Sequence, residues 1–302
     1  MAGRGVVEAG SKTALVTGAS KGIGRCFALR LARMGYNVVM VSLTASDLEA
    51  TAKEVQAAND RVWVRHYTKD MASMTSAEEL FAWTEQQAIK VDVLINNAGM
   101  FSFCDVLNTP VERIERLILL HNATVTKMCR LYAQDMAARG GGYILNMSSY
   151  SIWMPYPGLS LYSASKAYIK SFSVAFSKEV RDKKVYVTAI CPAGIATDLY
   201  GLSPRLQRFG LKLGALMRPS RAQKAKPAPP LCSKAFLRQR VTKLALSALP
   251  VFISAMRSLI PKTLLPSLTL YTNTTGRCSI ADAIPQLLRQ PHRALCSTVL
   301  TA

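Results

Sequence analysis

Residues 13–24 read TALVTGASKGIG, and this stretch decides the fold. Its first five residues are apolar or β-branched, a pattern that predicts a buried strand. Three glycines follow and lead into the helical pattern of residues 22–34. Glycine permits a tight turn, a close approach of the backbone to a phosphate and tight packing of the helix. Because the free N–H groups at the helix start would face that phosphate, the stretch predicts a strand–turn–helix unit that binds a dinucleotide.

The rest of residues 1–200 repeats this order of strand and helix. Expected strands span residues 13–17, 37–42, 62–67, 91–96, 142–146 and 185–191. Expected helices span residues 22–34, 46–58, 73–87, 111–138 and 163–181. Several strands are continuously apolar, which is typical of a parallel sheet covered on both faces. The alternation predicts an α/β fold with a doubly wound parallel sheet, the Rossmann fold, in one domain at residues 10–202.

The composition of this 302-residue chain indicates a folded, intracellular protein. Half of the residues are hydrophobic and 19% are charged, so a wholly disordered chain is excluded. The seven cysteines form no CxxC pair and the chain has three histidines, which argues against a disulfide scaffold and a structural metal site. Residues 1–10 lack the apolar core of a secretory signal. We therefore expect reduced thiols, no metal and a cytoplasmic location.

The formal charge of +20 is concentrated in the last third of the chain. Residues 1–200 hold 22 Lys and Arg against 17 Asp and Glu, whereas residues 201–302 hold 16 against one. No RNP, zinc-finger or basic-zipper pattern accompanies these cations, so nucleic acid is not an expected partner. The longest uncharged apolar run, residues 244–256, is shorter than the roughly 20 residues of a bilayer span. We expect the basic C-terminal extension, residues 203–302, to be a substrate lid or packing surface, or to contact a membrane surface through residues 203–270.

The end of the second expected strand bears on which dinucleotide binds. NAD sites usually have an acid here that bonds the ribose 2′-hydroxyl, but residues 41–44 read VSLT. A 2′-phosphate would not be repelled, Lys21 and Arg25 could neutralise it, and Ser42 or Thr44 could donate a hydrogen bond to it. These features favour NADP over NAD. The alternative is that Lys21 is only a solvated surface charge, and the nearest acid, Asp47, is expected inside the next helix.

A second set of residues indicates proton-transfer chemistry. Tyr162 and Lys166 are four residues apart in a helical pattern, so their side chains share one face. A phenol, with an ordinary pKa of about 10, is a poor base at neutral pH, but a nearby ammonium lowers that pKa. Ser149 and the NNAG turn at residues 96–99 each follow a strand. They would meet at the carboxyl edge of the sheet, where ligands bind in such folds.

These motifs together resemble the short-chain dehydrogenase/reductase family. TGASKGIG, NNAG, Asn122, Ser149 and YSASK occur in the family's order and spacing over about residues 10–202. The resemblance implies that Tyr162 is the general acid/base and that Lys166 lowers its pKa and binds the nicotinamide ribose. Ser149 would hold the substrate oxygen and Asn122 would support a proton-relay water. The expected cofactor contacts are Gly18, Ser20, Lys21, Gly22, Ile23, Gly24, Ser42, Asp70, Asn97, Ala98, Gly99, Tyr162, Lys166, Pro192, Gly194, Ile195 and Thr197.

Two departures from the family's pattern stand out. The glycine that usually follows the proline after the sixth strand is displaced by one residue in Pro192-Ala193-Gly194, which predicts a small backbone change. Leu43 stands where NADP-preferring relatives often have arginine, which weakens the case for NADP.

Three neighbouring residues are alternatives for the catalytic roles. Ser148 competes with Ser149, but adjacent residues leaving a strand point to opposite sides. Tyr168 competes with Tyr162 but has no lysine four residues later. His121, next to Asn122, invites an acid/base role, but we expect it to pack locally.

The predicted reaction is reversible hydride transfer between a nicotinamide and a carbonyl carbon, with Tyr162 moving the proton. The residues expected to wall the substrate are apolar: Tyr150, Ile152, Trp153, Met154, Pro155 and Tyr156 after Ser149, and Leu199, Tyr200 and Leu202 after Thr197. Together with the basic, apolar extension, this predicted substrate wall favours a lipid-like carbonyl of the 3-oxoacyl or sterol type. The resemblance also implies a homo-oligomer formed through helices 111–138 and 163–181. The alternatives are a non-catalytic dinucleotide-binding regulatory or scaffold protein, and an epimerase or dehydratase that uses the same Tyr/Lys pair. Retention of both side chains argues against the first, and the GxxxGxG spacing argues against the second.

Overall fold

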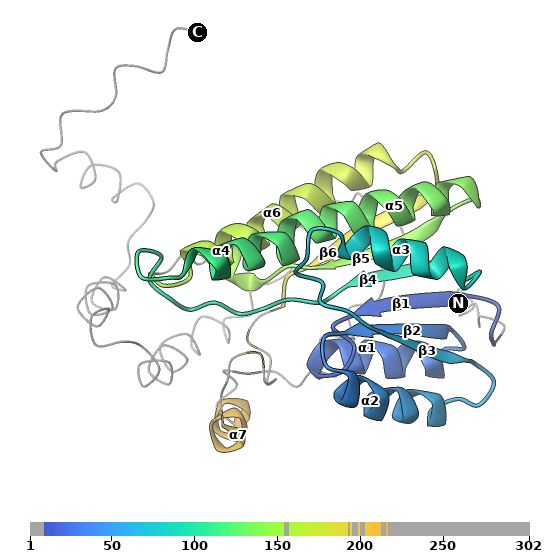
Figure 1. Ribbon diagram of the computed structural model, residues 1–302, viewed down its shortest axis with the longest axis horizontal. Coiled ribbons are helices and arrows are strands. Elements are labelled where there is room, and N and C mark those ends of the chain that lie inside the picture. Colours follow the sequence, from blue (N-terminus) through green and yellow to red (C-terminus); the bar gives the residue numbers. More distant parts are fainter. Residues whose placement is uncertain are drawn as a thin grey trace, which may run out of the picture. The chain divides into compact units, whose positions relative to one another are not determined.

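A computed structural model describes residues 9–153, 157–192, 194, 199, 203–212 and 216 of the chain. In this part, six parallel strands form one sheet in the order β3-β2-β1-β4-β5-β6 (Figure 1). The chain runs outward from β1 to β3, and then outward on the other side from β4 to β6, which confirms the doubly wound fold. The direction in which successive strands are added reverses between β1 and β4, and such sheets bind ligands at this point. The strands are β1 Thr13–Thr17, β2 Asn37–Ser42, β3 Val64–Thr68, β4 Val93–Asn96, β5 Gly142–Met147 and β6 Val185–Ile190.

Helices cover both faces of this sheet. Figure 1 shows α1 and α2 on one face and α3, α5 and α6 on the other. The helices are α1 Gly22–Arg33, α2 Ala45–Ala57, α3 Ser76–Gln86, α4 Val111–Ile118, α5 Thr124–Ala138, α6 Ser160–Glu179 and α7 Pro204–Lys212. A π-helical turn, η1 Leu119–Ala123, separates α4 from α5, and a 3-10 turn, η2 Tyr150–Trp153, follows β5.

Two apolar cores explain why the strands are continuously hydrophobic. Alternate residues of β1 belong to different cores, because successive side chains of a strand point to opposite faces. Leu15 packs with Leu80 and Met128 beneath α3 and α5, whereas Val16 packs with Leu48 beneath α1 and α2. Each of these side chains is fully buried, so the sheet is held firmly between its helices.

The bounds of several elements differ from those expected. The third and fourth strands begin at Val64 and Val93, two residues later than predicted, and the last strand ends one residue earlier, at Ile190. The helix that carries Tyr162 and Lys166 begins at Ser160, three residues earlier than predicted, so Tyr162 lies in its first turn. The helical stretch predicted for residues 111–138 has the predicted bounds, but the π turn η1 divides it into α4 and α5. A π turn inserts one residue into a helix, and an amphipathic pattern of average period 3.6 does not reveal it.

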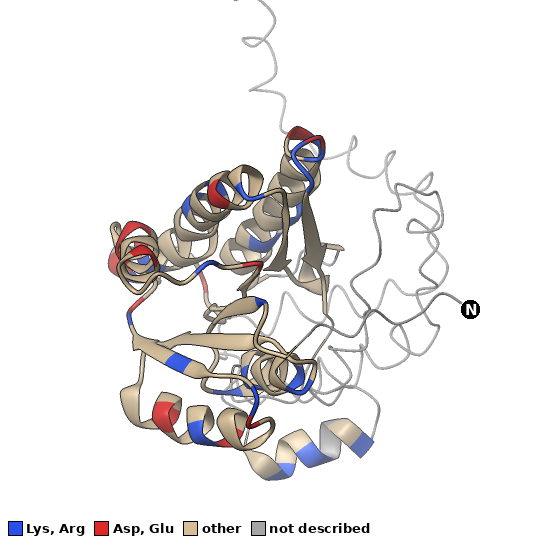
Figure 2. Ribbon diagram, turned by 90° about the vertical axis from the view of Figure 1, so that its right-hand side faces the viewer, with Lys and Arg blue, Asp and Glu red and all other residues tan. Residues whose placement is uncertain are grey.

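Most of the predicted basic extension, residues 203–302, lies outside the described residues. The part described includes α7, which carries the cations Arg205, Arg208 and Lys212. Figure 2 shows the Lys and Arg positions of the described chain in blue. Within the described ranges, no helix has the length and hydrophobicity needed to cross a bilayer. The domain boundary at residues 202 and 203 stays a prediction.

Candidate active site

The turn after β1 is built so that only glycine fits its key positions. Gly18 and Gly22 have φ angles of +63° and +55°, in the left-handed region that side chains disfavour. A Cβ atom on Gly18 would lie 2.9 Å from the Cα of Ala98, and one on Gly24 would overlap the carbonyl oxygen of Gly18. The first turn of α1 is thus pressed against the end of β1, with Ile23 packed on the core below. The N–H groups of this first turn of α1 lie at the sheet edge that is predicted to bind phosphate.

A threonine that the sequence analysis did not single out joins this turn to the NNAG turn. The hydroxyl of Thr17 accepts hydrogen bonds from the backbone N–H groups of Asn97 and Ala98, both at 3.0 Å. The Asn97 side chain donates back to the carbonyl oxygens of Thr17 and Gly18, at 3.0 and 3.2 Å. The two turns therefore form one rigid unit. The available sequence signal was a hydroxyl residue immediately before the first glycine of the turn.

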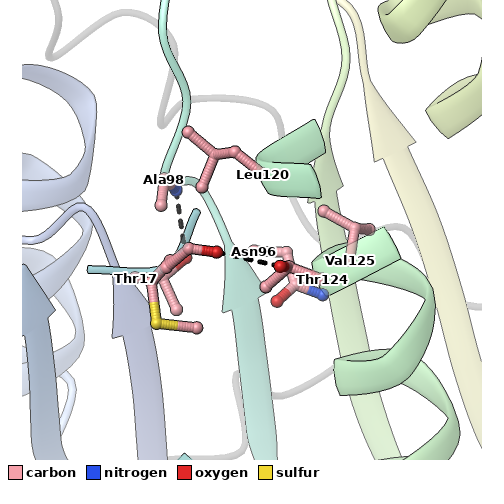
Figure 3. A pocket seen from close by; sticks show the side chains of 7 residues that line it. Thr17, Asn96, Ala98, Leu120, Thr124 and Val125 are labelled. Atoms are coloured by element: carbon pink, nitrogen blue, oxygen red, sulfur yellow. Dashed lines mark hydrogen bonds between the residues drawn. The ribbon is translucent and has the colours of Figure 1, made fainter. Parts of the chain in front are cut away.

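A small pocket opens beside this unit, at the carboxyl ends of β1 and β4 (Figure 3). The pocket lies between β1 and β4, where the order of strand addition reverses. Ligand sites of doubly wound folds lie at this point. The lining residues come from β1, β4, the segment after β3, and η1 with the start of α5: Thr17, Met71, Asn96, Ala98, Leu120, Thr124 and Val125.

The cations expected near a 2′-phosphate are paired with acids. Lys21 Nζ lies 2.7 Å from Asp47, which is in the first turn of α2 as expected, and Arg25 lies 2.5 Å from Glu54. Lys21 remains 58% exposed, so its ammonium can still be approached. Each cation is already neutralised in part, which reduces the attraction that the sequence suggested.

Ser20 and Ser42 lie together beside these ion pairs. Their hydroxyl oxygens are 2.8 Å apart, which joins the phosphate-binding turn to the end of β2. Thr51 of α2 donates to the carbonyl oxygen of Ser20 at 2.8 Å and holds that turn in place.

Tyr162 and Lys166 are brought together in a buried setting at the start of α6. Tyr162 is 5% exposed and packs edge-on against Phe101, with ring centroids 5.1 Å apart. Lys166 Nζ lies 5.8 Å from the Tyr162 ring centroid and donates to the carbonyl oxygen of Met147 at 3.0 Å. Burial lowers the pKa of Lys166 to about 7. An amine with this pKa changes its charge near neutral pH, which suits a partner in proton transfer.

The two serines after β5 have different surroundings. Ser148 is 2% exposed and donates its hydroxyl hydrogen to the carbonyl oxygen of Lys166 at 2.7 Å. Ser149 is only partly buried, and its oxygen accepts a 3.2 Å bond from the N–H of Ser151. The hydroxyl hydrogen of Ser148 is therefore already used in a hydrogen bond within the protein. This favours Ser149 for contact with a substrate.

Tyr168 lies on a different side of α6 from Tyr162. Its ring is 41% exposed and its hydroxyl lies 2.9 Å from that of Thr126 on α5. It therefore faces the neighbouring helix, and Tyr162 remains the candidate acid/base.

The π turn η1 carries Asn122 and His121. The side-chain oxygen of Asn122 is buried without a hydrogen-bond partner among the described residues. Such a group needs a partner, and a bound water would supply one. His121 is fully buried rather than exposed. Burial, with a smaller contribution from Lys166, holds its pKa well below the ordinary value, so the ring is neutral.

Asp70, in the segment after β3, is held by two hydrogen bonds. It accepts from the N–H of Ala72 and from Arg116 of α4, both at 2.9 Å. Burial works against the charged form, but these two bonds outweigh it and keep the pKa of Asp70 below the ordinary value. The carboxylate is charged and retains free lone pairs for a ligand.

The remaining predicted contacts lie after β6. The carbonyl oxygen of Pro192 accepts a 2.9 Å bond from the N–H of Tyr150, which joins the chain after β6 to the chain after β5. Gly194 is partly buried. Ile195, Thr197 and the predicted backbone change at Ala193 lie outside the described residues, as do residues 154–156, 200 and 202 of the predicted substrate wall.

Two aromatic side chains of η2 lie against each other and against α6. Tyr150 and Trp153 have ring centroids 5.4 Å apart, and the ammonium of Lys170 lies 4.4 Å from the Trp153 ring centroid. Trp153 is 52% exposed, so it offers an apolar surface to an incoming molecule. Among the described residues, no cluster of His, Cys, Asp and Glu is arranged to hold a metal ion.

Comparison with known proteins places these motifs in context. A family model described as short chain dehydrogenase matches residues 12–204. The chain is 35% identical over 192 residues to 17-beta-hydroxysteroid dehydrogenase type 3 of Homo sapiens, which covers 62% of this chain and 60% of that protein. It is 32% identical over 179 residues to the very-long-chain 3-oxoacyl-CoA reductase of Coccidioides immitis (strain RS), covering 59% of this chain and 51% of that protein. The chain thus spans between half and two thirds of the length of these relatives.

A solved structure, the short-chain dehydrogenase from Sphingobium yanoikuyae in complex with NADPH, has a similar fold. The TM-score is 0.65 at 26% sequence identity, and the match covers 83% of this chain and 96% of that one.

Proposed function

Since this chain belongs to the short-chain dehydrogenase family, we propose that it interconverts a carbonyl and an alcohol with a nicotinamide dinucleotide as redox partner. The observation that carries this proposal is the buried pair of Tyr162 and Lys166, whose amine lies at the carboxyl end of β5 and beside the turn after β4. A buried phenol next to an amine whose pKa is about 7 is suited to moving a proton at neutral pH. A dinucleotide-binding protein without catalysis has no need for this pair.

The described residues fit such a dinucleotide. Gly18 and Gly24 allow the first turn of α1 to pack closely on the ends of β1 and β4. This packing sets the N–H groups at the start of α1 where a pyrophosphate would bind. Asp70 would lie near the adenine, Asn97, Ala98 and Gly99 near the central part, and Lys166 near the nicotinamide ribose. When bound, the nicotinamide supplies or accepts the hydride at the substrate carbon.

The protein's own residues then handle the oxygen of the substrate. Ser149 donates a hydrogen bond to the carbonyl oxygen and polarises it. Tyr162 gives its hydroxyl proton to that oxygen as negative charge develops there, and takes a proton back in the reverse direction. The phenolate that forms and the ammonium of Lys166 stabilise one another. Asn122 binds, through its unpartnered side-chain oxygen, a water that returns the proton from solvent.

The finer assignment is a lipid-like carbonyl and NADP. Two relatives are named for steroid and very-long-chain 3-oxoacyl-CoA substrates, which supports an apolar substrate. Exposed Trp153 and partly buried Phe101 and Tyr150 would contact such a molecule. NADP is supported by the absence of an acid at residues 41–44 and by the NADPH in a similar solved structure. The Lys21–Asp47 pair works against it.

A homo-oligomer through α4, α5 and α6, contact with a membrane surface through the basic extension, and a cytoplasmic location are further proposals. Exposed apolar side chains on these helices, such as Val111, Ile118 and Val174, support the first. The cations of α7 support the second.

The test is a panel of steroid, 3-oxoacyl and small polar carbonyls, each assayed with NADPH and with NADH. We expect oxidation of NADPH with an apolar carbonyl, and Tyr162→Phe should abolish turnover while the dissociation constant for NADPH changes less than about twofold. The matched control is Tyr168→Phe, which removes a hydroxyl from the same helix and should leave turnover unchanged. If the wild-type protein binds NADPH but reduces none of the carbonyls in the panel, the regulatory alternative is favoured.

A further inference from the structure

His121 lies between two segments of the candidate site. Its Nε2 is 3.1 Å from the backbone nitrogen of Met100, just after the NNAG turn. Its Nδ1 is 2.9 Å from the hydroxyl of Ser165 on α6. That hydroxyl donates to the backbone carbonyl oxygen of Tyr162 at 2.8 Å. His121 and Ser165 are 0% and 4% exposed, so water does not compete for these bonds.

The direction of each bond fixes where the imidazole proton lies. A backbone N–H can only donate, so Nε2 of His121 accepts from Met100 and carries no hydrogen. A carbonyl oxygen can only accept, so Ser165 gives its hydroxyl hydrogen to Tyr162. The oxygen of Ser165 is then free to accept from Nδ1. The ring is therefore neutral, with its one hydrogen on Nδ1.

The surroundings of the ring exclude a second positive charge. A Cβ atom on Gly99 would lie 3.2 Å from Nε2 of His121 and 3.4 Å from Nζ of Lys166, so both nitrogens border the space left by one glycine. A charged imidazole here would repel the ammonium of Lys166. Burial also disfavours the imidazolium, as the lowered pKa of His121 indicates. No carboxylate is among the groups that shift this pKa.

We propose that His121 is a positioning residue, whose neutral ring connects the backbone of Met100 to the carbonyl of Tyr162 through Ser165. The connection holds the first turn of α6 at a set distance from the NNAG turn. His121 does not itself exchange a proton with substrate, because both ring nitrogens are already in hydrogen bonds with protein groups. The π turn η1 is the local feature from which His121 reaches both segments, in line with the frequent use of such turns at functional sites. This inference rests on the proposed function.

The tautomer can be measured without any substrate. The chain has three histidines, so a long-range nitrogen–proton NMR spectrum of 15N-histidine-labelled protein is simple, and His121→Gln identifies the signals of residue 121. We expect one histidine with hydrogen on Nδ1 only, unchanged from about pH 5 to 8, where an ordinary histidine titrates. A ring with its hydrogen on Nε2, or one that titrates in this range, would overturn the proposal.

Kinetics of three substitutions separate positioning from simple packing. His121→Gln keeps an acceptor for Met100, His121→Asn keeps a donor for Ser165, and His121→Leu removes both bonds. We expect kcat to fall by about 10- to 100-fold in the leucine variant, because displacement of a catalytic group by about 1 Å has an effect of that size. The two amide variants should recover part of the loss, and the dissociation constant for NADPH should stay within about twofold.

Two further variants complete the test. Tyr132→Phe removes a buried 3.1 Å hydrogen bond to Thr84 from the helical stretch that follows His121. This bond is not part of the chain through His121 and Ser165, so the substitution should leave kcat unchanged. Ser165→Ala should lower kcat as His121→Leu does, and the double variant should lose no more than either, because each breaks the same chain of bonds.

An unchanged kcat in folded His121→Leu, an equal loss in Tyr132→Phe, or additive losses with Ser165→Ala would each overturn the proposal. If the leucine variant does not fold, the amide variants and the tautomer still decide it. A wild-type protein without carbonyl turnover would refute the proposed activity, whereas the NMR spectrum alone would still test the chain of bonds.

Discussion

Lys166→Met should make the unfolding free energy of the protein less dependent on pH. The native pKa of Lys166 is about 7, against 10.5 for an ordinary lysine, because burial disfavours the ammonium. Between these two values the unfolded chain binds a proton that the native protein does not. Stability contributed by this group is therefore present in full above pH 10.5, falls as pH is lowered, and is lost below about pH 7.

The size of the effect follows from the two pKa values. Each unit of pKa difference corresponds to about 1.4 kcal/mol, so complete loss amounts to at most about 5 kcal/mol. Methionine has a similar length and no charge, and its main cost is the hydrogen bond to Met147, worth roughly 1 kcal/mol. At pH 6 the variant should therefore be more stable than the wild type by a few kcal/mol, and this advantage should vanish as the pH approaches 10.

Urea unfolding of both proteins at several pH values measures the difference directly. Other groups with altered pKa values, such as the Cys26 and Tyr36 side chains, are present in both proteins and cancel in the comparison. Parallel curves of unfolding free energy against pH would refute the reasoning, because they would mean that Lys166 is not desolvated in the native protein.

Three further predictions concern the cofactor edge. Gly24→Ala should weaken dinucleotide binding by at least about 10-fold, since its Cβ would overlap the preceding turn; calorimetric titration with NADPH checks this. Asp47→Asn releases Lys21 from its ion pair and should raise the preference for NADPH over NADH, by about 3- to 10-fold in kcat/KM; an unchanged ratio would show that Lys21 does not reach a 2′-phosphate. Asp70→Asn removes an exposed ion pair with Arg116, so it should change the unfolding free energy by less than about 1 kcal/mol. In the wild type, this contribution should be lost as the pH falls through the lowered pKa of Asp70.

Local patterns predicted the elements best where strong signals marked both ends. The first two strands, Thr13–Thr17 and Asn37–Ser42, have the predicted bounds because glycine, polar turn residues and a change of periodicity flank them. The third strand was predicted to begin two residues too early. Apolar residues precede Val64, but pairing with β2 begins only at Val64. Strand pairing is decided by the neighbouring strand, which a local pattern does not contain.

The candidate site divides in the same way. Residue type and spacing along one chain segment were enough to place Tyr162 and Lys166 on one helix face and the glycines at one turn, because these relations are local. The pairing of Lys21 with Asp47 and the hydrogen bond from the Ser148 hydroxyl to Lys166 depend on partners distant in sequence. The π turn η1 leaves no mark in the amphipathic pattern of residues 111–138.

Local patterns were sufficient to predict the doubly wound fold, the glycine-rich turn and the shared helix face of Tyr162 and Lys166, because backbone conformation and side-chain periodicity are local properties. The charge and protonation of the side chains at the sheet edge depend instead on contacts that exist only in the folded protein. Burial sets the pKa of Lys166, and the backbone of Met100, 21 residues from His121, selects the tautomer of that ring. Solvation and hydrogen bonding are fixed by whichever groups the fold brings alongside, and no single segment carries that information.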